Sequence, residues 1–365
     1  MDLMTIFKTA IEHRASDIHI TPGKPPMMRL KEDIVPITND TVLSSEQSKA
    51  IIYSILSDSQ KAKFEENWEL DCSFSIKGLS RFRLNVFVSK NGIEAVARII
   101  PSIIPTPDEI KLSKEIVTMT DLSKGLILVT GPTGCGKSTT LASLINLINQ
   151  KHKRNIITIE DPIEFTYENN QSIIRQREVN QHTKSFANAL KSALREDPDV
   201  ILVGEIRDLE TIQLTLTTAE TGHLTFATLH TQDAATTVDR IVDVFPPHQQ
   251  NQIRIQLASS LRAVVSQMLL PRKDGFGVVA AREIMTMTPA ISNLIREGKT
   301  HLIYSAIETG AKFGMIPMDR ALACLVRSNI VDMEAAVAKA TDKEGFRKLV
   351  MGGFDGESTE SVQRG

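Results

Sequence analysis

The sequence predicts two domains: a small α+β domain, followed by a larger α/β domain with a mostly parallel sheet. Three observations predict this arrangement. The chain has 365 residues, which is more than one domain usually holds. A proline-rich segment interrupts it near residue 101. From residue 124 onward, short apolar runs alternate with helical segments, which is typical of parallel strands buried on both faces.

The first domain is expected to span residues 1–100. Apolar side chains at helical spacing over residues 3–11 predict an amphipathic helix, and a second helix is expected over 45–66. Between them, "DIHI" predicts a strand and "MMRLKEDIVPI" a pair of strands with a turn. The runs "CSFSI", "SRFRLNVFVS" and "IEAVARII" alternate or are β-branched, which predicts three further strands.

A linker is expected over residues 101–115, because Pro101, Pro105 and Pro107 fall within seven positions. Proline lacks the backbone N–H and fixes φ, so this stretch is predicted to be neither a helix nor a central strand. The two predicted domains would therefore be joined by an extended segment.

The second domain is expected to span residues 116–345. Its strands are predicted at "GLILVT", "NIITIE", "VILVGE" and "LTFATLH", with helices between them. Past residue 245 strands become rare, and "NQIRIQLASSLRAVVSQMLL" is predicted to be a helix because its apolar residues form one stripe. Helices then continue toward the C-terminus, and residues 346–365 are expected to form a disordered polar tail.

Composition excludes several classes of protein. The formal net charge of −2 and the pI near 6.5 predict no overall attraction to nucleic acid or anionic membrane. Cysteines stand only at 72, 135 and 324, a scattered set that fits a reducing cytoplasm. No signal-peptide pattern and no apolar run of about 18 residues is seen, so we expect a soluble cytoplasmic protein.

A phosphate-binding loop is predicted at "GPTGCGKST", which matches G-x-x-x-x-G-K-[ST] between a strand and a helix. Lys137 would reach the β- and γ-phosphates, and the Ser138 hydroxyl would ligate Mg²⁺. Cys135 is either an oxidation target or a small tolerated residue. The predicted nucleotide-binding residues are Gly131, Thr133, Gly134, Cys135, Gly136, Lys137, Ser138 and Thr139.

Carboxylates follow two predicted strands, where ligands of open parallel sheets bind. Glu160, Asp161 and Glu164 follow one strand, and Glu205 follows another, with Arg207 close behind. Hydrolysis of a phosphoanhydride needs a held Mg²⁺ and a group that orients or deprotonates water. One acid from each strand end could meet these needs, and the residues alone do not decide which of the first three acts on water.

Two histidines, His223 and His230, flank the strand "LTFATL". A shared metal site is geometrically awkward, because residues seven apart on a strand point to opposite faces and no third ligand lies nearby. The alternatives are structural bonds to backbone, or a role at the phosphate for His230, which follows the carboxyl end of the strand. His223, at the strand's entrance, would then support the interface or the loop.

Arginines mark one face of the predicted strand "SRFRLNVFV", which alternates basic and apolar residues. Transition-state charge on a γ-phosphate is commonly met by an arginine. A solvated surface charge is the alternative for each of them taken singly. Arg81 and Arg83 lie on this face.

Four stretches together resemble the motifs of a known family. "GPTGCGKSTT", "TIEDPIE", "REDPDVILVGEIRD" and "ETGHLTFATLHT" are similar, in that order, to the Walker A, Asp, Walker B and His boxes of secretion ATPases. "ASDIHI" and "PAISNLIREGK" narrow the resemblance to the type IV pilus retraction ATPases, the PilT family. The resemblance covers about residues 1–345. It departs from the family pattern at Ser292, where the family has a basic residue.

The resemblance implies a RecA-like P-loop NTPase domain with a PAS-like N-terminal domain, and it implies ATP and Mg²⁺ as ligands. The resemblance implies that Glu164 is the general base and that Glu205 helps to hold Mg²⁺. His230 would report the γ-phosphate to a neighbouring subunit. The resemblance further implies that arginines of the N-terminal domain close over the nucleotide, which makes Arg81, Arg83 and Arg98 the candidates.

The resemblance also implies a homohexameric motor that powers pilus retraction and twitching motility. Its expected partners are an inner-membrane pilus platform protein and a paralogous pilus ATPase, with the ring on the cytoplasmic side of the inner membrane. The alternatives are a PilU-type accessory ATPase, a related type II or type IV secretion ATPase and, more distantly, a RecA-like DNA translocase. The last would be expected to carry a basic patch, and no nucleic-acid partner is expected.

Overall fold

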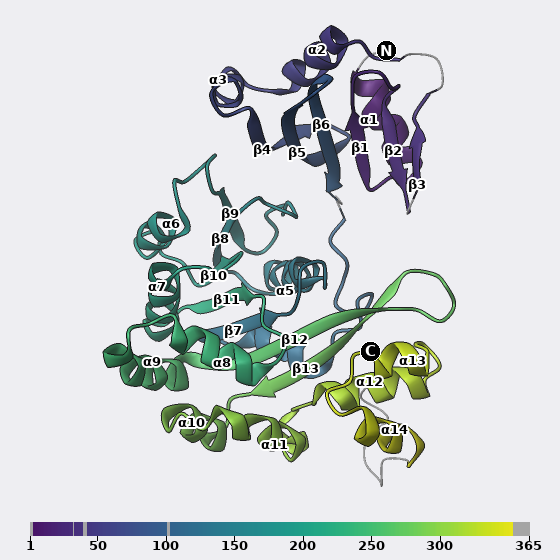
Figure 1. Cartoon of the computed structure of the whole chain (residues 1–365). Coiled ribbons are helices and arrows are strands. Elements are labelled where there is room, and N and C mark those ends of the chain that lie inside the picture. Colours follow the sequence, from purple (N-terminus) through teal and green to yellow (C-terminus); the bar gives the residue numbers. More distant parts are fainter. Residues whose placement is uncertain (1–2, 32, 39–41, 101–102, 353–365) are drawn as a thin grey trace. The chain divides into compact units, whose positions relative to one another are not determined.

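The computed structural model divides the chain into two compact units (Figure 1). Unit 1 comprises Met1–Ile103 and Pro162–Phe165, and unit 2 comprises Ile104–Asp161 and Thr166–Gly365. The residues described are 3–31, 33–38, 42–100 and 103–352. Residues 104–115 of the predicted linker belong to unit 2, and Leu112 among them is buried in its core. Pro101 lies outside the described residues.

Unit 1 is built on an antiparallel sheet of six strands, in the order β3-β2-β1-β6-β5-β4. Helices α1 (Leu3–Glu12), α2 and α3 accompany the sheet, and Phe7, Ile52 and Phe82 lie in the shared core. This is the predicted α+β arrangement. The strands are β1 (Asp17–Ile20), β2 (Met27–Leu30), β3 (Asp33–Pro36), β4 (Glu69–Ile76), β5 (Ser80–Ser89) and β6 (Gly92–Ile100).

The single helix predicted over residues 45–66 is wrong, since the structure has two helices there: α2 (Ser45–Ile55) and α3 (Asp58–Asn67). Leu56 between them is extended. Ser57 starts the second helix, because its side chain accepts a hydrogen bond from the Gln60 backbone and the Gln60 side chain accepts one in return. This reciprocal cap satisfies helix-end donors and favours a new start over a continuous helix.

Unit 2 is built on a seven-stranded sheet in the order β13-β12-β7-β11-β10-β8-β9. Every neighbouring pair is parallel except β12 with β13, so the predicted mostly parallel sheet is confirmed. The strands are β7 (Gly125–Thr130), β8 (Asn155–Glu160), β9 (Ile173–Glu178), β10 (Val200–Val203), β11 (Leu224–Leu229), β12 (Leu261–Pro271) and β13 (Val278–Thr286).

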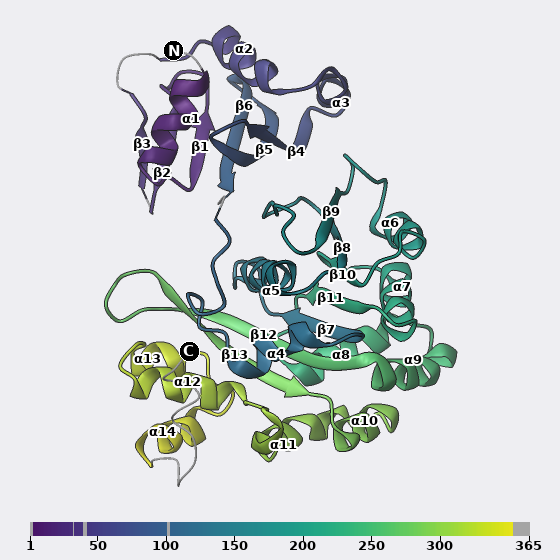
Figure 2. The same ribbon diagram turned by 180° about the vertical axis from the view of Figure 1, so that it is seen from behind.

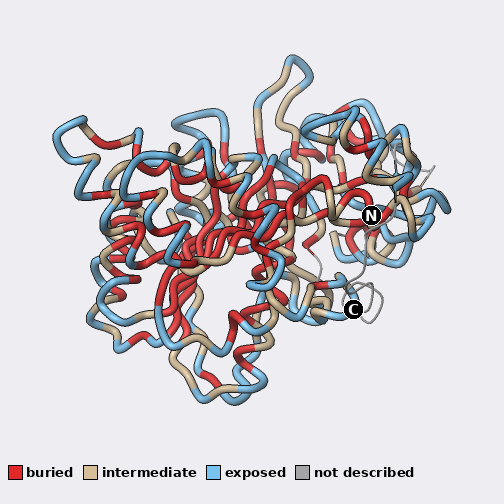
Figure 3. The backbone as a smooth tube through the Cα atoms, turned by 90° about the horizontal axis from the view of Figure 1, so that it is seen from below, coloured by how far each residue is buried: buried red, intermediate tan, exposed pale blue. Residues whose placement is uncertain are grey.

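Helices cover both faces of this sheet, as seen from the front and from behind (Figures 1 and 2). In β7, Ile127 and Val129 share a core with helices α4 and α5, whereas Leu126 and Leu128 point into the core of the opposite face. Buried residues therefore follow one another along the strands (Figure 3). The helices are α4 (Lys114–Thr118) and α5 (Lys137–Lys151) on one face, and α6 (Phe186–Ala193), α7 (Leu209–Glu220), α8 (Ala234–Asp243), α9 (Pro247–Ser260), α10 (Pro289–Arg296) and α11 (Ile303–Glu308) on the other.

The helix predicted to run from about residue 251 to 270 is wrong in its second half. Helix α9 ends at Ser260, and Leu261–Pro271 forms strand β12 between β7 and β13. Val264 and Val265 lie on opposite faces of the sheet, and both are fully buried. A strand buried on both faces carries no polar alternation, so its apolar run can match a helical stripe equally well.

The C-terminal helices pack against the far end of the β12–β13 hairpin. Leu270 and Val279 of the hairpin share a core with α12 (Met318–Arg327), α13 (Met333–Val337) and α14 (Lys343–Met351). The tail predicted to be disordered from residue 346 is therefore wrong for its first residues, which belong to α14. Its remainder, 353–365, lies outside the described residues. Among the described helices, none has the length and apolar character needed to span a bilayer.

A buried acid, Glu283 on β13, joins the hairpin to helix α8. Its Oε1 atom accepts a hydrogen bond of 2.9 Å from the Ala234 backbone, and the residue is 2% exposed. Burial, helped by the negative charges of Asp233 and Asp319, outweighs the lowering effect of backbone hydrogen bonds and raises the pKa of Glu283 from its ordinary value of 4.5 to about 7. The folded chain therefore keeps this proton at a pH where the unfolded chain has lost it.

Stability is accordingly expected to fall as the pH rises from 5 to 8, because the unfolded state loses its proton first. Glu283 should contribute on the order of 3 kcal/mol to this fall. Urea unfolding followed by circular dichroism at several pH values measures it, and Glu283→Gln should flatten the profile. Glu334→Gln, which alters an exposed glutamate, is the control. An identical pH slope in wild type and Glu283→Gln would contradict the assignment.

Candidate functional site

The phosphate loop joins the central strand β7 to helix α5 and depends on glycine at both ends. Gly131 and Gly136 have φ angles of 139° and 86°, which side-chain-bearing residues rarely adopt. A Cβ atom on Gly131 would lie 2.2 Å from the Gln267 carbonyl oxygen. The loop thus passes so close to β12 that only glycine fits, and it delivers the chain to the N-terminus of α5, where backbone N–H groups favour an anion.

Lys137, the first residue of α5, is held over the loop. Its ammonium donates hydrogen bonds to the carbonyl oxygens of Gly131 at 2.8 Å and Pro132 at 3.1 Å. Phosphate oxygens carry negative charge and carbonyl oxygens do not, so phosphates attract an ammonium more strongly. A phosphate group entering the loop would therefore take over this side chain.

Glu205 lies at the centre of a charged cluster beyond the ends of β10 and β11. Its Oε2 atom accepts a bond of 2.6 Å from Arg207, and its Oε1 atom lies 2.9 Å from Nε2 of His230. Burial pushes the pKa of Glu205 upward, but the hydrogen bond and charge of Arg207, with the charges of His230 and Lys137, outweigh it, and the pKa is lowered. The group is therefore a carboxylate near neutral pH.

The oxygen donors near the loop fit Mg²⁺, which prefers hard oxygen ligands and keeps several waters. Ser138 follows Lys137 in the first turn of α5 and offers a hydroxyl, and Glu205 offers an ionised carboxylate. Lys137 is near enough to Glu205 to affect its pKa, so the acid and the loop belong to one site. These two residues are the ones that would hold the ion.

The remaining predicted loop residues fall into two groups. Thr133 and Gly134 are exposed and Thr139 is half-buried, so they line the mouth of the loop. Cys135 is buried, and burial raises the pKa of its thiol despite the opposing charge of Lys137. A buried neutral thiol is a poor target for oxidants, which favours the interpretation of Cys135 as a small tolerated residue.

The three acids after β8 have different surroundings. Glu160 is buried and accepts a 2.6 Å bond from the Thr158 hydroxyl, so it belongs to the strand end. Asp161 is exposed, and its charge helps to raise the pKa of Arg207. Glu164 is also exposed and lies in the segment Pro162–Phe165, which groups with unit 1. Because Glu160 is buried, it is a poorer candidate for acting on water than the exposed Asp161 and Glu164.

The two histidines lie at opposite ends of β11, a strand of six residues. His223 precedes it, and its Nδ1 atom lies 3.0 Å from the Thr218 carbonyl oxygen. His230 follows it and contacts Glu205. A strand of this length spans roughly 20 Å, so the two side chains cannot share a metal ion.

The candidate arginines all lie in the sheet of unit 1, and their face is occupied rather than open. Arg83 pairs with Asp71 at 2.6 Å, and Arg98 pairs with Asp17 at 2.9 Å. Arg81 donates a 2.5 Å bond to the Ser73 hydroxyl. A role at a phosphate would therefore require these side chains to exchange partners.

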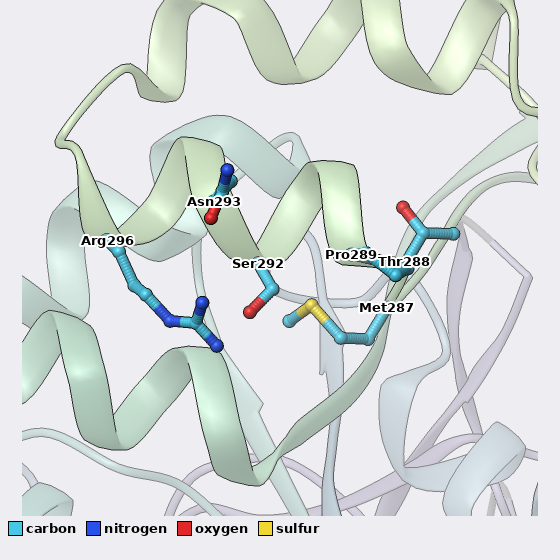
Figure 4. Close-up of a pocket in the computed structure, with 6 residues that line it drawn as sticks. All are labelled: Met287, Thr288, Pro289, Ser292, Asn293 and Arg296. Atoms are coloured by element: carbon cyan, nitrogen blue, oxygen red, sulfur yellow. The ribbon is translucent and has the colours of Figure 1, made fainter.

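The stretch "PAISNLIREGK" begins with helix α10 (Pro289–Arg296), and a pocket opens beside this helix (Figure 4). Ser292 is buried and donates a 3.3 Å bond to the Ala258 carbonyl oxygen of α9, so it ties the two helices together. The pocket is lined by Met287, Thr288, Pro289, Ser292, Asn293 and Arg296.

Two buried polar residues of β12 were not predicted, and only one of them, Gln267, contacts the loop. Ser266 accepts a 2.9 Å bond from the Thr130 hydroxyl, and the Gln267 side chain bonds the loop itself at Cys135. They were missed because this segment was predicted to be a helix. Two consecutive polar residues inside an apolar run are the signal that could have drawn attention to it.

Comparison with known proteins identifies the family of the chain. The family model described as "Type II/IV secretion system protein" matches residues 1–288. The chain is 49% identical over 346 residues to the "Type IV pilus retractation ATPase PilT" of Pseudomonas aeruginosa, covering 95% of this chain and 100% of the relative. It is also 49% identical to a "Twitching motility protein" of Neisseria gonorrhoeae, covering 91% and 90%.

Solved structures give the same result. The "Crystal Structure of the Pilus Retraction Motor PilT and Bound ADP" matches with a TM-score of 0.90 and 44% identity, over 96% of this chain and 100% of that one. The structure of the Legionella pneumophila ATPase DotB matches with a TM-score of 0.77 and 28% identity, over 92% and 95%.

Replacing His230 with alanine is expected to lower the rate of nucleoside triphosphate hydrolysis by about tenfold to a hundredfold, because Glu205 loses one of the groups that orient it. Steady-state phosphate release measures this. His223→Ala is the matched control at the other end of the same strand and should change the rate by less than about twofold. Equal effects of the two substitutions would contradict the placement of His230 in the site.

Proposed function

The chain belongs to the PilT family of secretion ATPases, and on this premise we propose that it hydrolyses ATP to drive the retraction of a type IV pilus. The observation that carries the proposal is the phosphate loop with Lys137 and the neighbouring Glu205–His230 pair on adjacent strand ends. The relatives described as a pilus retraction ATPase and a twitching motility protein support the motor role.

In the proposed reaction the phosphates of ATP bind the N–H groups of the loop and draw Lys137 away from the Gly131 and Pro132 carbonyls. Mg²⁺, held through Ser138 and Glu205, would supply positive charge at the phosphates. Arg207 and His230 keep the Glu205 carboxylate fixed and ionised. A water molecule attacks the γ-phosphorus, the bond to the β,γ-bridging oxygen breaks, and ADP and phosphate are released.

Glu164 is proposed to accept the proton of the attacking water. The residue is exposed, whereas Glu160 is buried at the strand end. The choice of Glu164 over Asp161 rests on the resemblance of "TIEDPIE" to the Asp box. Asp161, by contrast, contributes to the charge around Arg207.

Glu164→Gln is expected to reduce ATP hydrolysis by about a hundredfold or more, because an amide cannot accept the proton. ATP should still bind with an affinity within about twofold of wild type, since the loop is unchanged. Phosphate release and fluorescent-nucleotide binding measure the two quantities. Glu168→Gln, an exposed glutamate in the same loop, is the control. Hydrolysis at the wild-type rate in Glu164→Gln would remove the residue from this role.

The motor is proposed to be a homohexameric ring in which hydrolysis moves one subunit against the next. Arg81, Arg83 and Arg98 are proposed to meet the charge of the γ-phosphate after leaving their partners in unit 1. We expect light scattering of the Glu164→Gln protein with bound ATP to give the mass of a hexamer. The mass of a single chain under those conditions would count against the ring.

The proposed partner is a pilus platform protein of the inner membrane, reached from the cytoplasmic side. A second pilus ATPase is a further proposed partner, since the chain is also 36% identical to the "Type IV pilus ATPase PilU" of Pseudomonas aeruginosa, over 98% of this chain and 94% of the relative. The same likeness makes an accessory role the main alternative.

Deleting the gene in its host tests the retraction role. We expect cells with excess surface pili and no twitching movement, because assembly continues while retraction stops. Pilus number by electron microscopy and movement on agar are the measurements, and a plasmid copy of the wild-type gene should restore both. Cells without pili would indicate an assembly role. Normal twitching would contradict a principal role in retraction and favour an accessory one.

A further inference from the structure

Gln267 is a buried amide that reaches from strand β12 to the phosphate loop. It is 2% exposed, and both ends of its side chain are occupied. Its Nε2 atom donates a 2.6 Å bond to the Cys135 carbonyl oxygen, and its Oε1 atom accepts a 2.9 Å bond from the Thr140 hydroxyl. Because a carbonyl can only accept, the amide nitrogen must face Cys135, so chemistry fixes the orientation of the side chain.

This contact sets the direction of one peptide group in the loop. In a trans peptide the C=O and the following N–H point in opposite directions. Since the Cys135 carbonyl is turned toward Gln267, the N–H of Gly136 points away from β12. That N–H is the first of the backbone N–H groups that continue into the first turn of α5, where the phosphate is expected to bind.

The loop needs such an external support because its own backbone is permissive. Gly131, Gly134 and Gly136 all have positive φ angles, and glycine moves readily between backbone conformations. Gln267 touches the loop at both ends: its backbone carbonyl lies against Gly131, and its side chain holds Cys135. Thr140 in turn ties the same side chain to the body of α5.

We propose that Gln267 is a positioning residue for nucleotide binding, which holds the Cys135–Gly136 peptide in the orientation that the phosphates require. It acts through Cys135 and Thr140. The inference rests on the proposed function, because it assumes that the loop binds ATP and ADP. Without the amide, the Cys135 carbonyl loses its buried partner, the peptide is free to turn, and only a fraction of molecules holds the competent loop.

The test is Gln267→Met, which keeps the length of the side chain but removes both hydrogen bonds. In the full-length chain, the Kd for a fluorescent ADP analogue is expected to rise about tenfold. The KM for ATP should rise by a similar factor while kcat stays within about twofold, because the change affects ground state and transition state alike. If the role of Gln267 were purely structural, the substitution would lower the melting temperature without raising KM selectively over kcat.

Two further variants keep the result interpretable. Thr140→Val removes one anchor of the amide and should raise the Kd for the ADP analogue about threefold, and adding it to Gln267→Met should raise the Kd no further. Ser266→Ala is the matched control. Ser266 precedes Gln267 in β12, and the substitution removes its buried hydrogen bond with Thr130, the last residue of β7, without touching the loop. It should lower the melting temperature and leave the Kd for the ADP analogue unchanged.

Wild-type affinity for the ADP analogue in a folded Gln267→Met protein would overturn the proposal. If that variant does not fold, unchanged affinity in Thr140→Val would overturn it equally. A rise in Kd of similar size in Ser266→Ala would also overturn it, because it would show a general effect of weakening β12. Failure of the wild-type chain to bind the nucleotide would instead contradict the proposed function.

Discussion

The close approach between the phosphate loop and strand β12 is the constraint on which the rest of the site depends. Gly131 lies against the Gln267 backbone so tightly that no side chain fits, and the Gln267 amide holds the other end of the loop at Cys135. β7 runs between β11 and β12 in the middle of a sheet buried on both faces. The glycine-rich loop is therefore held by a strand of the buried sheet.

The charged cluster beyond β10 and β11 depends on the same sheet. The parallel pairing of these strands brings Glu205 and His230 to the same edge, although they are far apart in sequence. Arg207 and Lys137 offset the cost of partly burying the carboxylate, so the acid stays ionised. Rigid support of the loop and fixed charges beside it are what catalysis by positioning and electrostatics requires.

Much of this site could be predicted from the sequence because its residues fall in short local motifs. The loop from Gly131 to Ser138 has a fixed spacing, and the acids and His230 directly follow apolar runs that read as strands. The helix break at Ser57 was missed because a cap depends on a local competition between two helical arrangements. The segment around Val265 was misassigned because burial on both faces removes the alternation that marks a strand.

The role of Gln267 could not be predicted from the sequence, because it depends on a contact between residues more than a hundred positions apart. The arginines of unit 1 show the opposite case: alternation correctly placed Arg81 and Arg83 on one face, but the partners Ser73 and Asp71 come from a neighbouring strand. Sequence patterns thus indicate which side chains share a surface. They do not indicate which partners these side chains already contact.

The most direct test of the account is a crystal structure of the chain with Mg²⁺ and a non-hydrolysable ATP analogue. We expect Lys137 to leave the Gly131 and Pro132 carbonyls for the phosphates, while the bond between Gln267 and Cys135 stays near its present 2.6 Å. Nucleotide binding would then be explained by a loop that keeps its conformation while the Lys137 side chain changes partners. Phosphates bound elsewhere, or a Gln267 side chain turned away from the loop, would contradict it.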